Sequence, residues 1–316
     1  MVNSATRTSA PVAVIDLGSN TVLLLVIEPG GKVLRDEARI TRLGEGVFTT
    51  GVLDPAAELR TRKVVREFAS RARALGAQRV VGVGTAALRR ARDGERVLQE
   101  LCAEGALDAG HLLDGQQEAE LSIAASLRAR DPSQGPLLVI DVGGGSTELA
   151  WTRGRDEVQG ASLALGSVRL TEAHVSRHPI PAAELAELRN AVERGSAELA
   201  HARGLDGSGE VVAVAGTATT LAAMELRLSR YVAEAVEGLA LERQTLSRWI
   251  AELSRMSVGE RRRLPGLEPG RADVIVAGLV ILEGMLGAIG AERFRVSGRG
   301  LRFGVAFRLL EGRNLV

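Results

Sequence analysis

Apolar positions along the chain fall into short runs separated by glycine-rich turns and amphipathic stretches. Residues 12–28 (VAVIDLGSNTVLLLVIE) and 137–153 (LLVIDVGGGSTELAWTR) share one pattern. In each, an apolar run leads to Asp-x-Gly and small polar residues, and a second apolar run follows. Short runs around a glycine-rich turn predict a hairpin of two strands rather than a helix. The pattern therefore predicts an internal repeat, with each half of the chain starting at a similar hairpin.

The segments after each hairpin alternate between strands and helices. In the first half, Asp54 and Pro55 predict the start of a helix and Gly76 its end. Further elements are expected as strands at 79–83 and 111–113, and as helices at 86–103 and 116–128. In the second half we expect strands at 158–165, 211–215 and 293–297, helices from Pro181 and at 271–289, and a closing helix. This alternation predicts an α/β fold in which helices cover mixed sheets.

The turn-rich segment 131–136 is the best candidate for a domain boundary. It divides the chain into domains at residues 1–130 and 131–316.

Composition narrows the range of partners. The chain has 316 residues, and its 40 basic and 39 acidic side chains leave a net charge of +1, so we expect neither nucleic acid nor a membrane as a partner. A single cysteine excludes an internal disulfide and a cysteine-rich zinc site. No targeting segment is visible, and the longest apolar stretch, 274–282, is too short to span a membrane. We therefore expect a cytoplasmic protein.

The two Asp-x-Gly turns are candidate phosphate sites. Glycine allows backbone N–H groups to approach a ligand, and successive N–H groups in a turn form a concave anion site. Asp16 and Asp141, each near the end of a strand, suit Mg²⁺. Alternatively, each aspartate only caps its own turn. Two matched copies favour phosphate binding.

Other candidates are weaker when taken alone. Turns at 82–85 and 215–220 lead from a strand into a helix, a geometry that suits an anion but also close packing. Glu118 is a candidate general base, although the helix dipole alone favours a glutamate in a first helical turn. Arg89 and Arg271 stand beside such turns and could clamp phosphate. We expect 261–263, three arginines in a row, to form a solvated face.

Taken together, these motifs resemble those of a known family, that of the exopolyphosphatases and guanosine pentaphosphate phosphohydrolases, in a short two-domain form. The motifs that carry the resemblance follow the family order at residues 16–21, 41–46, 84–89, 115–121, 140–148, 165–170, 215–220, 265–271 and 297–304. The resemblance implies two ribonuclease-H-like domains of the actin, hexokinase and Hsp70 superfamily around a central cleft.

The resemblance also assigns roles to residues. Glu118 falls on the catalytic glutamate that acts on the attacking water, and Asp141 and Glu148 join it as catalytic residues. Asp16, Asp141 and Glu148 fall on positions linked to Mg²⁺. The phosphate-binding positions are Ser19, Asn20, Arg89, Gly143, Gly144, Gly145, Ser146, Thr147, Gly216, Thr217 and Arg271.

Four positions differ from the family pattern. Gln117 replaces a frequent second acid, and Glu120 replaces a usual basic residue. Gly298 and Phe303 replace a frequent Asp and Glu near the C-terminus.

The resemblance implies a Mg²⁺-dependent phosphohydrolase that removes terminal phosphate from inorganic polyphosphate. Guanosine pentaphosphate is the alternative substrate, because both are linear phosphoanhydrides. Two further functions stay open: a sugar or acid kinase, and a sensor that binds polyphosphate or an alarmone without turnover. A homodimer is a family expectation.

Overall fold

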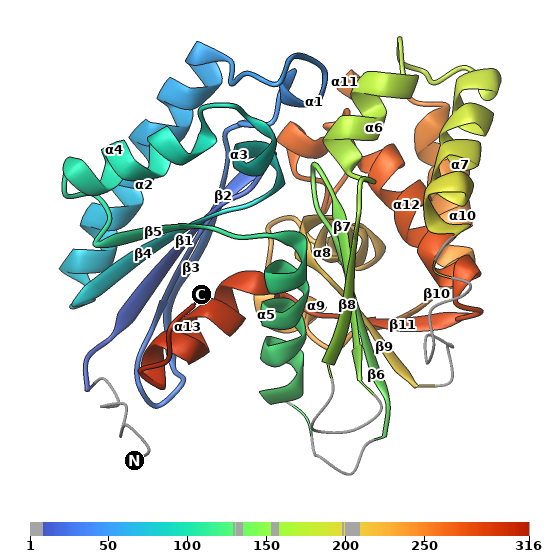
Figure 1. Cartoon of the computed structure of the whole chain (residues 1–316). Coiled ribbons are helices and arrows are strands. Elements are labelled where there is room, and N and C mark those ends of the chain that lie inside the picture. The colour runs from blue at the N-terminus through green and yellow to red at the C-terminus, as the bar shows by residue number, and fades with distance from the viewer. Residues whose placement is uncertain are drawn as a thin grey trace. The chain divides into compact units, whose positions relative to one another are not determined.

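The computed structural model describes residues 9–128, 130, 135–152, 158–197, 199 and 209–315. These residues form two compact units (Figure 1). The first unit contains the chain up to Ala125 and the segment from Leu301 onward, and the second contains Ser126–Gly300. The sequence predicts that the second domain spans residues 131–316. The structure differs from this prediction, because the segment from Leu301 onward belongs to the first unit. Residues 131–134 of the predicted boundary segment lie outside the described residues.

The first unit is built on a five-stranded sheet. Its strands are β1 (Val12–Leu17), β2 (Thr21–Ile27), β3 (Val33–Ile40), β4 (Arg79–Gly84) and β5 (Ala109–Leu112), in the order β3-β2-β1-β4-β5. β1 pairs antiparallel with β2 and parallel with β4, which confirms the predicted hairpin. Half of the residues of β3, at the edge of the sheet, are charged, and the apolar pattern does not predict this strand.

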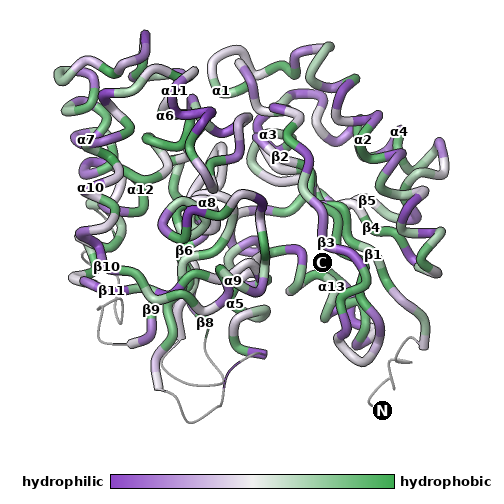
Figure 2. Tube along the Cα trace, turned by 180° about the vertical axis from the view of Figure 1, so that it is seen from behind, coloured by the Kyte–Doolittle hydropathy of each residue, from purple (hydrophilic) through white to green (hydrophobic). Residues whose placement is uncertain are grey.

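Helices cover both faces of this sheet (Figure 1). They are α1 (Val47–Thr50), α2 (Pro55–Ala74), α3 (Ala86–Arg90), α4 (Gly94–Ala103), α5 (Gly115–Arg128) and α13 (Leu301–Leu310). Ala13 and Ile15 of β1 pack on the side of α2 and α4, and Val12 and Val14 pack on the side of α5 and α13. Figure 2 shows β1 and β4 mainly in the green of apolar residues, whereas α2 alternates between green and purple, as a helix with one buried face requires.

The start of α2 follows its prediction. The Asp54 side chain accepts a hydrogen bond from the Ala57 backbone N–H at 2.8 Å, and Pro55 occupies the first turn. The predicted helix at 86–103 is wrong in one respect, because the chain forms α3 and α4 with a break between them. Gly94 explains the break: a Cβ there would lie 1.9 Å from the Leu88 carbonyl oxygen, so the chain folds back tightly onto α3.

Two contacts hold α13 in the first unit. Arg302 donates to both carboxylate oxygens of Asp36 on β3, at 3.0 and 2.7 Å. Gly304 lies against α5, since a Cβ there would come within 1.9 Å of the Leu121 carbonyl oxygen. The helix that closes the sequence therefore belongs to the core in which the sequence starts, and turn signals along the chain could not show this.

The second unit repeats the first sheet. Its strands are β6 (Leu137–Val142), β7 (Thr147–Thr152), β8 (Val158–Leu163), β9 (Glu210–Val214), β10 (Ala240–Glu242) and β11 (Arg293–Val296). Their order is β10-β11-β9-β6-β7-β8, with β6 antiparallel to β7 and parallel to β9. Five of these strands reproduce the order and directions of the first sheet, and β10 adds an antiparallel edge. The predicted internal repeat is thus confirmed in three dimensions.

The helices of the second unit are α6 (Ser167–His174), α7 (Ala182–Ser196), α8 (Ala215–Glu225), α9 (Ala233–Val236), α10 (Arg243–Ser254), α11 (Val258–Arg261) and α12 (Ile275–Ala288). α12 is buried on nearly all sides and packs with α7 and α10 in the largest core of the molecule. Arg271, which the sequence pattern places at the start of this helix, lies in a short 3₁₀ turn (Pro269–Arg271) before it. Among the described residues, none of the helices has the length and apolar character needed to cross a membrane.

Candidate active site

Backbone hydrogen bonds join the first Asp-x-Gly turn to the segment that follows β3. The Ser19 carbonyl accepts from the Gly44 backbone N–H at 2.7 Å, and the Asn20 carbonyl accepts from two further backbone N–H groups, at 3.1 and 3.0 Å. A Cβ at Gly44 would lie 2.8 Å from the Ser19 Cβ, so only glycine allows this approach. The family-like motif at 41–46 therefore fixes the shape of the turn.

The side-chain amide of Asn20 in this turn can donate a hydrogen bond to a ligand. The side chain is 6% exposed, and its Nδ2 group meets no hydrogen-bond acceptor in the described part of the chain. A buried amide without an acceptor is costly. A phosphate oxygen would satisfy it, in agreement with the predicted role of Asn20.

Glu118 lies in the first turn of α5 and is 5% exposed. It forms an ion pair with Arg89 of α3, and the same Arg89 Nη1 donates to the Leu113 carbonyl at 2.6 Å. A helix-dipole role alone would leave Glu118 in solvent, but it is buried and held by an arginine. The structure thus joins a predicted catalytic residue to a predicted phosphate-binding residue.

Asp16 is buried near the end of β1. Because side chains alternate along a strand, it shares a face with Val12 and Val14. That is the face on which Leu121 of α5 packs. Asp16 and the helix that carries Glu118 therefore lie on the same side of the first sheet.

In the second unit, the β6–β7 register places Asp141 directly opposite Glu148. Opposed residues of this kind have Cβ atoms about 4.5–5.5 Å apart, and like charges there destabilise the sheet unless they are compensated. Ser162 of β8 donates to Glu148 Oε1 at 2.9 Å. Among the described residues, no group of three or more His, Cys, Asp or Glu side chains could hold a metal. Mg²⁺ is commonly bound by one or two carboxylates together with substrate phosphates, so the Asp141–Glu148 pair fits this ion.

The second glycine-rich turn packs against the start of α6. The Gly143 carbonyl accepts from the Ser167 backbone N–H at 3.0 Å, and the Gly144 carbonyl accepts from that of Val168 at 2.9 Å. A Cβ at Gly166 would come within 2.4 Å of the Gly144 oxygen. These contacts hold the turn rigid, and a rigid backbone is what an anion site made of N–H groups needs.

Two predicted phosphate-binding threonines use their hydroxyl groups internally. Thr147 Oγ1 donates to the Leu165 carbonyl at 2.6 Å. Thr217 Oγ1 donates to the Val142 carbonyl at 3.3 Å and so joins the start of α8 to the end of β6. Both side chains are buried, so their backbone N–H groups are the donors that could reach a ligand.

The start of α8 has a strained backbone and a close arginine. Ala215 adopts φ +65°, an uncommon value for a residue other than glycine. A Cβ at Gly216 would lie 2.1 Å from Arg271 Nη1, so the guanidinium occupies the space that glycine leaves. Burial lowers the pKa of Arg271, and the nearby Glu268 acts in the opposite direction. A positive charge beside a helix N-terminus favours an anion.

Three of the four departures from the family pattern have local explanations. Gln117 completes a reciprocal cap with Asp114, with hydrogen bonds of 2.9 and 2.8 Å at the start of α5. Glu120 lies 3.8 Å from Arg308. Phe303 is buried in the core of the first unit and cannot serve as a ligand.

The fourth departure, Gly298, still has a carboxylate beside it. Glu237 accepts from the Gly298 backbone N–H at 2.9 Å and from Ser297 Oγ at 2.8 Å. Glu237 could not be found from the sequence, because it lies far from 297–304 along the chain and in no motif.

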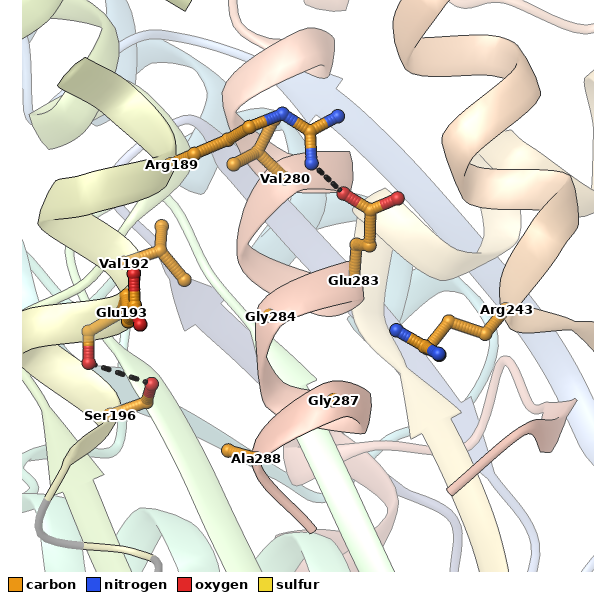
Figure 3. Close-up of a pocket in the computed structure, with 10 residues that line it drawn as sticks. All are labelled: Arg189, Val192, Glu193, Ser196, Arg243, Val280, Glu283, Gly284, Gly287 and Ala288. Carbon is orange, nitrogen blue, oxygen red and sulfur yellow. Dashed lines mark hydrogen bonds and ion pairs between the residues drawn. The ribbon is translucent and has the colours of Figure 1, made fainter. Parts of the chain in front are cut away.

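A cavity of about 460 Å³ opens between α7, α10 and α12 (Figure 3). None of the predicted site residues lines it. Its main charged groups are already paired, since Glu283 accepts from Arg189 and Ser247. Two arginines, Arg189 and Arg243, line it together with two carboxylates, Glu193 and Glu283, so the lining has no net positive charge to attract a polyanion.

Comparisons with known proteins find relatives that match this chain over nearly its whole length. The chain is 32% identical to "Exopolyphosphatase 2" of Mycobacterium tuberculosis over 94% of this chain and 98% of that protein. It is 28% identical to a "Guanosine-5'-triphosphate,3'-diphosphate pyrophosphatase" of Vibrio atlanticus, over 95% of this chain but 59% of that longer protein. The crystal structure of an Aquifex aeolicus member of the Ppx/GppA family aligns with a TM-score of 0.77 and 30% identity, over 96% of this chain and 99% of that one.

The duplicated sheet and its two glycine-rich turns define an α/β protein of the actin, hexokinase and Hsp70 superfamily. Within that superfamily, the chain belongs to the Ppx/GppA phosphatase family, whose model matches residues 26–312. The chain is thus a hydrolase of phosphoanhydride bonds.

Proposed function

We propose that this protein releases terminal orthophosphate from inorganic polyphosphate with Mg²⁺ as its cofactor. The observation that carries the proposal is the buried Glu118, held by Arg89 at the start of α5. A carboxylate that an arginine holds in one orientation can accept a proton from a neighbouring water molecule. The Mycobacterium tuberculosis relative, which this chain matches over 98% of its length, is named an exopolyphosphatase, and this name supports polyphosphate as the substrate.

In the proposed reaction, water attacks the terminal phosphorus in line, and Glu118 accepts its proton. A P–O bond forms to the water oxygen, and the P–O bond to the next phosphate breaks. Arg89 keeps the carboxylate oriented through their ion pair. Asp141 and Glu148 would hold Mg²⁺, which when bound neutralises charge on the phosphate oxygens, and the metal role of Asp16, which lies in the other unit, stays a prediction from the sequence.

Phosphate binding is assigned to both turns. In the first unit, Ser19 and the Asn20 amide donate to phosphate oxygens. In the second unit, the backbone N–H groups of 144–147 and of Gly216 and Thr217 do so, beside Arg271, while the Gly143 N–H donates to the Ser146 carbonyl within the turn. Because these groups recognise phosphate oxygens alone, they accept any linear phosphoanhydride.

Guanosine pentaphosphate is therefore the second candidate substrate, and the pyrophosphatase relative favours it. The homodimer and the cytoplasmic location stay predictions from the sequence.

The test is phosphate release from tripolyphosphate, long-chain polyphosphate and guanosine pentaphosphate in parallel, each with Mg²⁺ and with excess chelator. We expect Mg²⁺-dependent release that is fastest from polyphosphate. Faster release from guanosine pentaphosphate would change the substrate. Binding without release at every Mg²⁺ concentration would indicate the sensor, and full turnover in chelator would contradict the metal assignment.

A further inference from the structure

Arg261 is the largest of the fully buried side chains, with 0% exposure. This overturns the expectation that 261–263 form a solvated face. Its neighbours Arg262 and Arg263 are exposed, so the three arginines in a row have different environments. Complete burial of an arginine is rare unless its donors are used.

The guanidinium of Arg261 bridges two carbonyl groups from different segments. Nε donates to the Leu253 carbonyl in the last turn of α10, at 2.8 Å, and Nη1 donates to the Ala272 carbonyl at 3.0 Å. Burial lowers the pKa of Arg261 to about 10, although nearby Asp273 opposes the shift. The first contact caps a helix C-terminus, which is a common role for a cation. The second contact is not explained by that role.

The Ala272 carbonyl belongs to the residue directly after Arg271. Ala272 is itself fully buried, and the segment is further held because the Arg271 backbone N–H donates to the Glu268 carbonyl at 2.8 Å. Arg261 thus links the backbone that follows Arg271 to the last turn of α10. At the other end of Arg271, the guanidinium fills the space beside Gly216 at the start of α8.

We propose that Arg261 is a positioning residue, which acts through the Ala272 carbonyl to hold Arg271 against Gly216 where a phosphate group binds. The proposal rests on the phosphate contact assigned to Arg271 under the proposed function. Arg261 itself contacts no substrate. Its planar fork can bridge two carbonyl groups, a geometry that a lysine ammonium does not reproduce.

The test compares Arg261→Lys with Arg262→Lys, a matched change one residue away on the exposed surface. Losing one hydrogen bond to a charged group changes a binding constant by roughly tenfold or more. We therefore expect KM for tripolyphosphate to rise about tenfold in Arg261→Lys. We expect kcat to stay within about threefold, because Glu118 and the carboxylate pair are unchanged. Arg262→Lys leaves both constants at wild-type values.

A double-mutant cycle separates positioning from general destabilisation. If Arg261 acts through Arg271, Arg261→Lys has no further effect on KM in an Arg271→Ala background. An additive effect in that background would overturn the proposal. Where lysine at 261 prevents folding, Arg261→Gln takes its place, because the amide can donate to a carbonyl without burying a charge.

A second readout does not depend on turnover. The Arg271 Nε–H signal in a ¹⁵N NMR spectrum, assigned by its loss in Arg271→Lys, reports the environment of this side chain. Arg261→Lys should shift this signal and speed its solvent exchange, and Arg262→Lys should not. An unchanged signal overturns the proposal even if the wild type hydrolyses polyphosphate. A changed signal in a protein without phosphate release supports the proposal while the proposed function fails.

Discussion

The two sheets share one backbone plan but differ at the row of residues beside each turn. In the first sheet, Asp16 of β1 lies opposite Leu23 of β2. In the second, the corresponding Asp141 of β6 lies opposite Glu148 of β7. The duplicated frame therefore positions an aspartate twice but builds a carboxylate pair only once. Metal chemistry can be concentrated in one copy while the fold of both stays the same.

The helices after the fourth strand of each copy differ in the same way. α3 is short and contributes Arg89 to Glu118. α8 is longer, carries no arginine of its own, and receives Arg271 from a distant turn instead. Under the proposed function, the first unit therefore supplies the general base together with one phosphate turn, and the second supplies an anion site that depends on Arg271.

The largest expected effect comes from Glu118→Gln in the first unit. The amide keeps the shape of the side chain but cannot accept a proton, so kcat should fall about 10²–10⁴-fold while polyphosphate affinity changes little. Steady-state kinetics with Glu120→Gln on the same helix as control measures this. Retention of more than about a tenth of wild-type kcat would exclude Glu118 as the base.

Glu148→Gln makes the second sheet resemble the first by removing one charge from the carboxylate pair. The Mg²⁺ concentration for half-maximal activity should rise about 10–100-fold, as for the loss of groups that tune a metal site. Ser162→Ala is the matched control, because it removes the hydrogen bond to Glu148 and keeps the carboxylate. Ser162→Ala should raise the Mg²⁺ requirement less than Glu148→Gln does, and an unchanged requirement in Glu148→Gln would show that Glu148 is not a ligand.

Arg302→Met should destabilise the first unit alone. It breaks a largely buried ion pair and leaves Asp36 without its bidentate partner, which we expect to cost about 2 kcal/mol. Hydrogen exchange should speed up in peptides of β1–β3 and stay unchanged in β6–β8, because the two units have separate cores. Arg308→Met, which removes only a 3.8 Å contact, is the control. Equal effects on both units would contradict this separation.

The smallest effect concerns pH. Burial alone would raise the pKa of Glu37, but its hydrogen bond with Arg71 and further arginine contacts lower it below the ordinary value of a glutamate. A lowered folded-state pKa gives stability that is present above the unfolded-state pKa and lost as the pH falls through the folded one. Glu37→Gln should therefore lose less stability on acidification, by about 0.5 kcal/mol. Thermal melts at neutral and acidic pH, with Glu67→Gln as control, measure the difference; equal losses in wild type and Glu37→Gln would contradict it.

The sequence predicts the repeat because both hairpins are coded locally, by apolar runs and a glycine-rich turn. The break between α3 and α4 escapes prediction because it depends on the contact of Gly94 with the Leu88 carbonyl. The return of α13 to the first unit depends on Arg302 meeting Asp36 from the other end of the chain. Such long-range contacts leave no periodic signal in the sequence.

The same limit applies to the site. The turns and Glu118 could be identified from motifs, but their partners could not. Three contacts join residues from different motifs or from none. They are the Glu118–Arg89 ion pair, the packing of the Arg271 guanidinium against Gly216, and the hydrogen bond from Gly298 to Glu237. Arg261 shows the converse, since three consecutive arginines look alike in sequence and only packing distinguishes the buried one.

The most direct test of the division between the two units is a single-turnover titration of tripolyphosphate with Glu118→Gln and with Gly216→Ala. A Cβ at Gly216 would displace the Arg271 guanidinium, whereas Glu118→Gln leaves the phosphate turns intact. We predict that Glu118→Gln lowers the rate at saturation and keeps the half-saturating concentration. Gly216→Ala should raise that concentration about tenfold or more and keep the saturated rate within a few-fold. If both variants change the same constant, the assignment of the base to Glu118 and of anion binding to Gly216 and Arg271 is wrong.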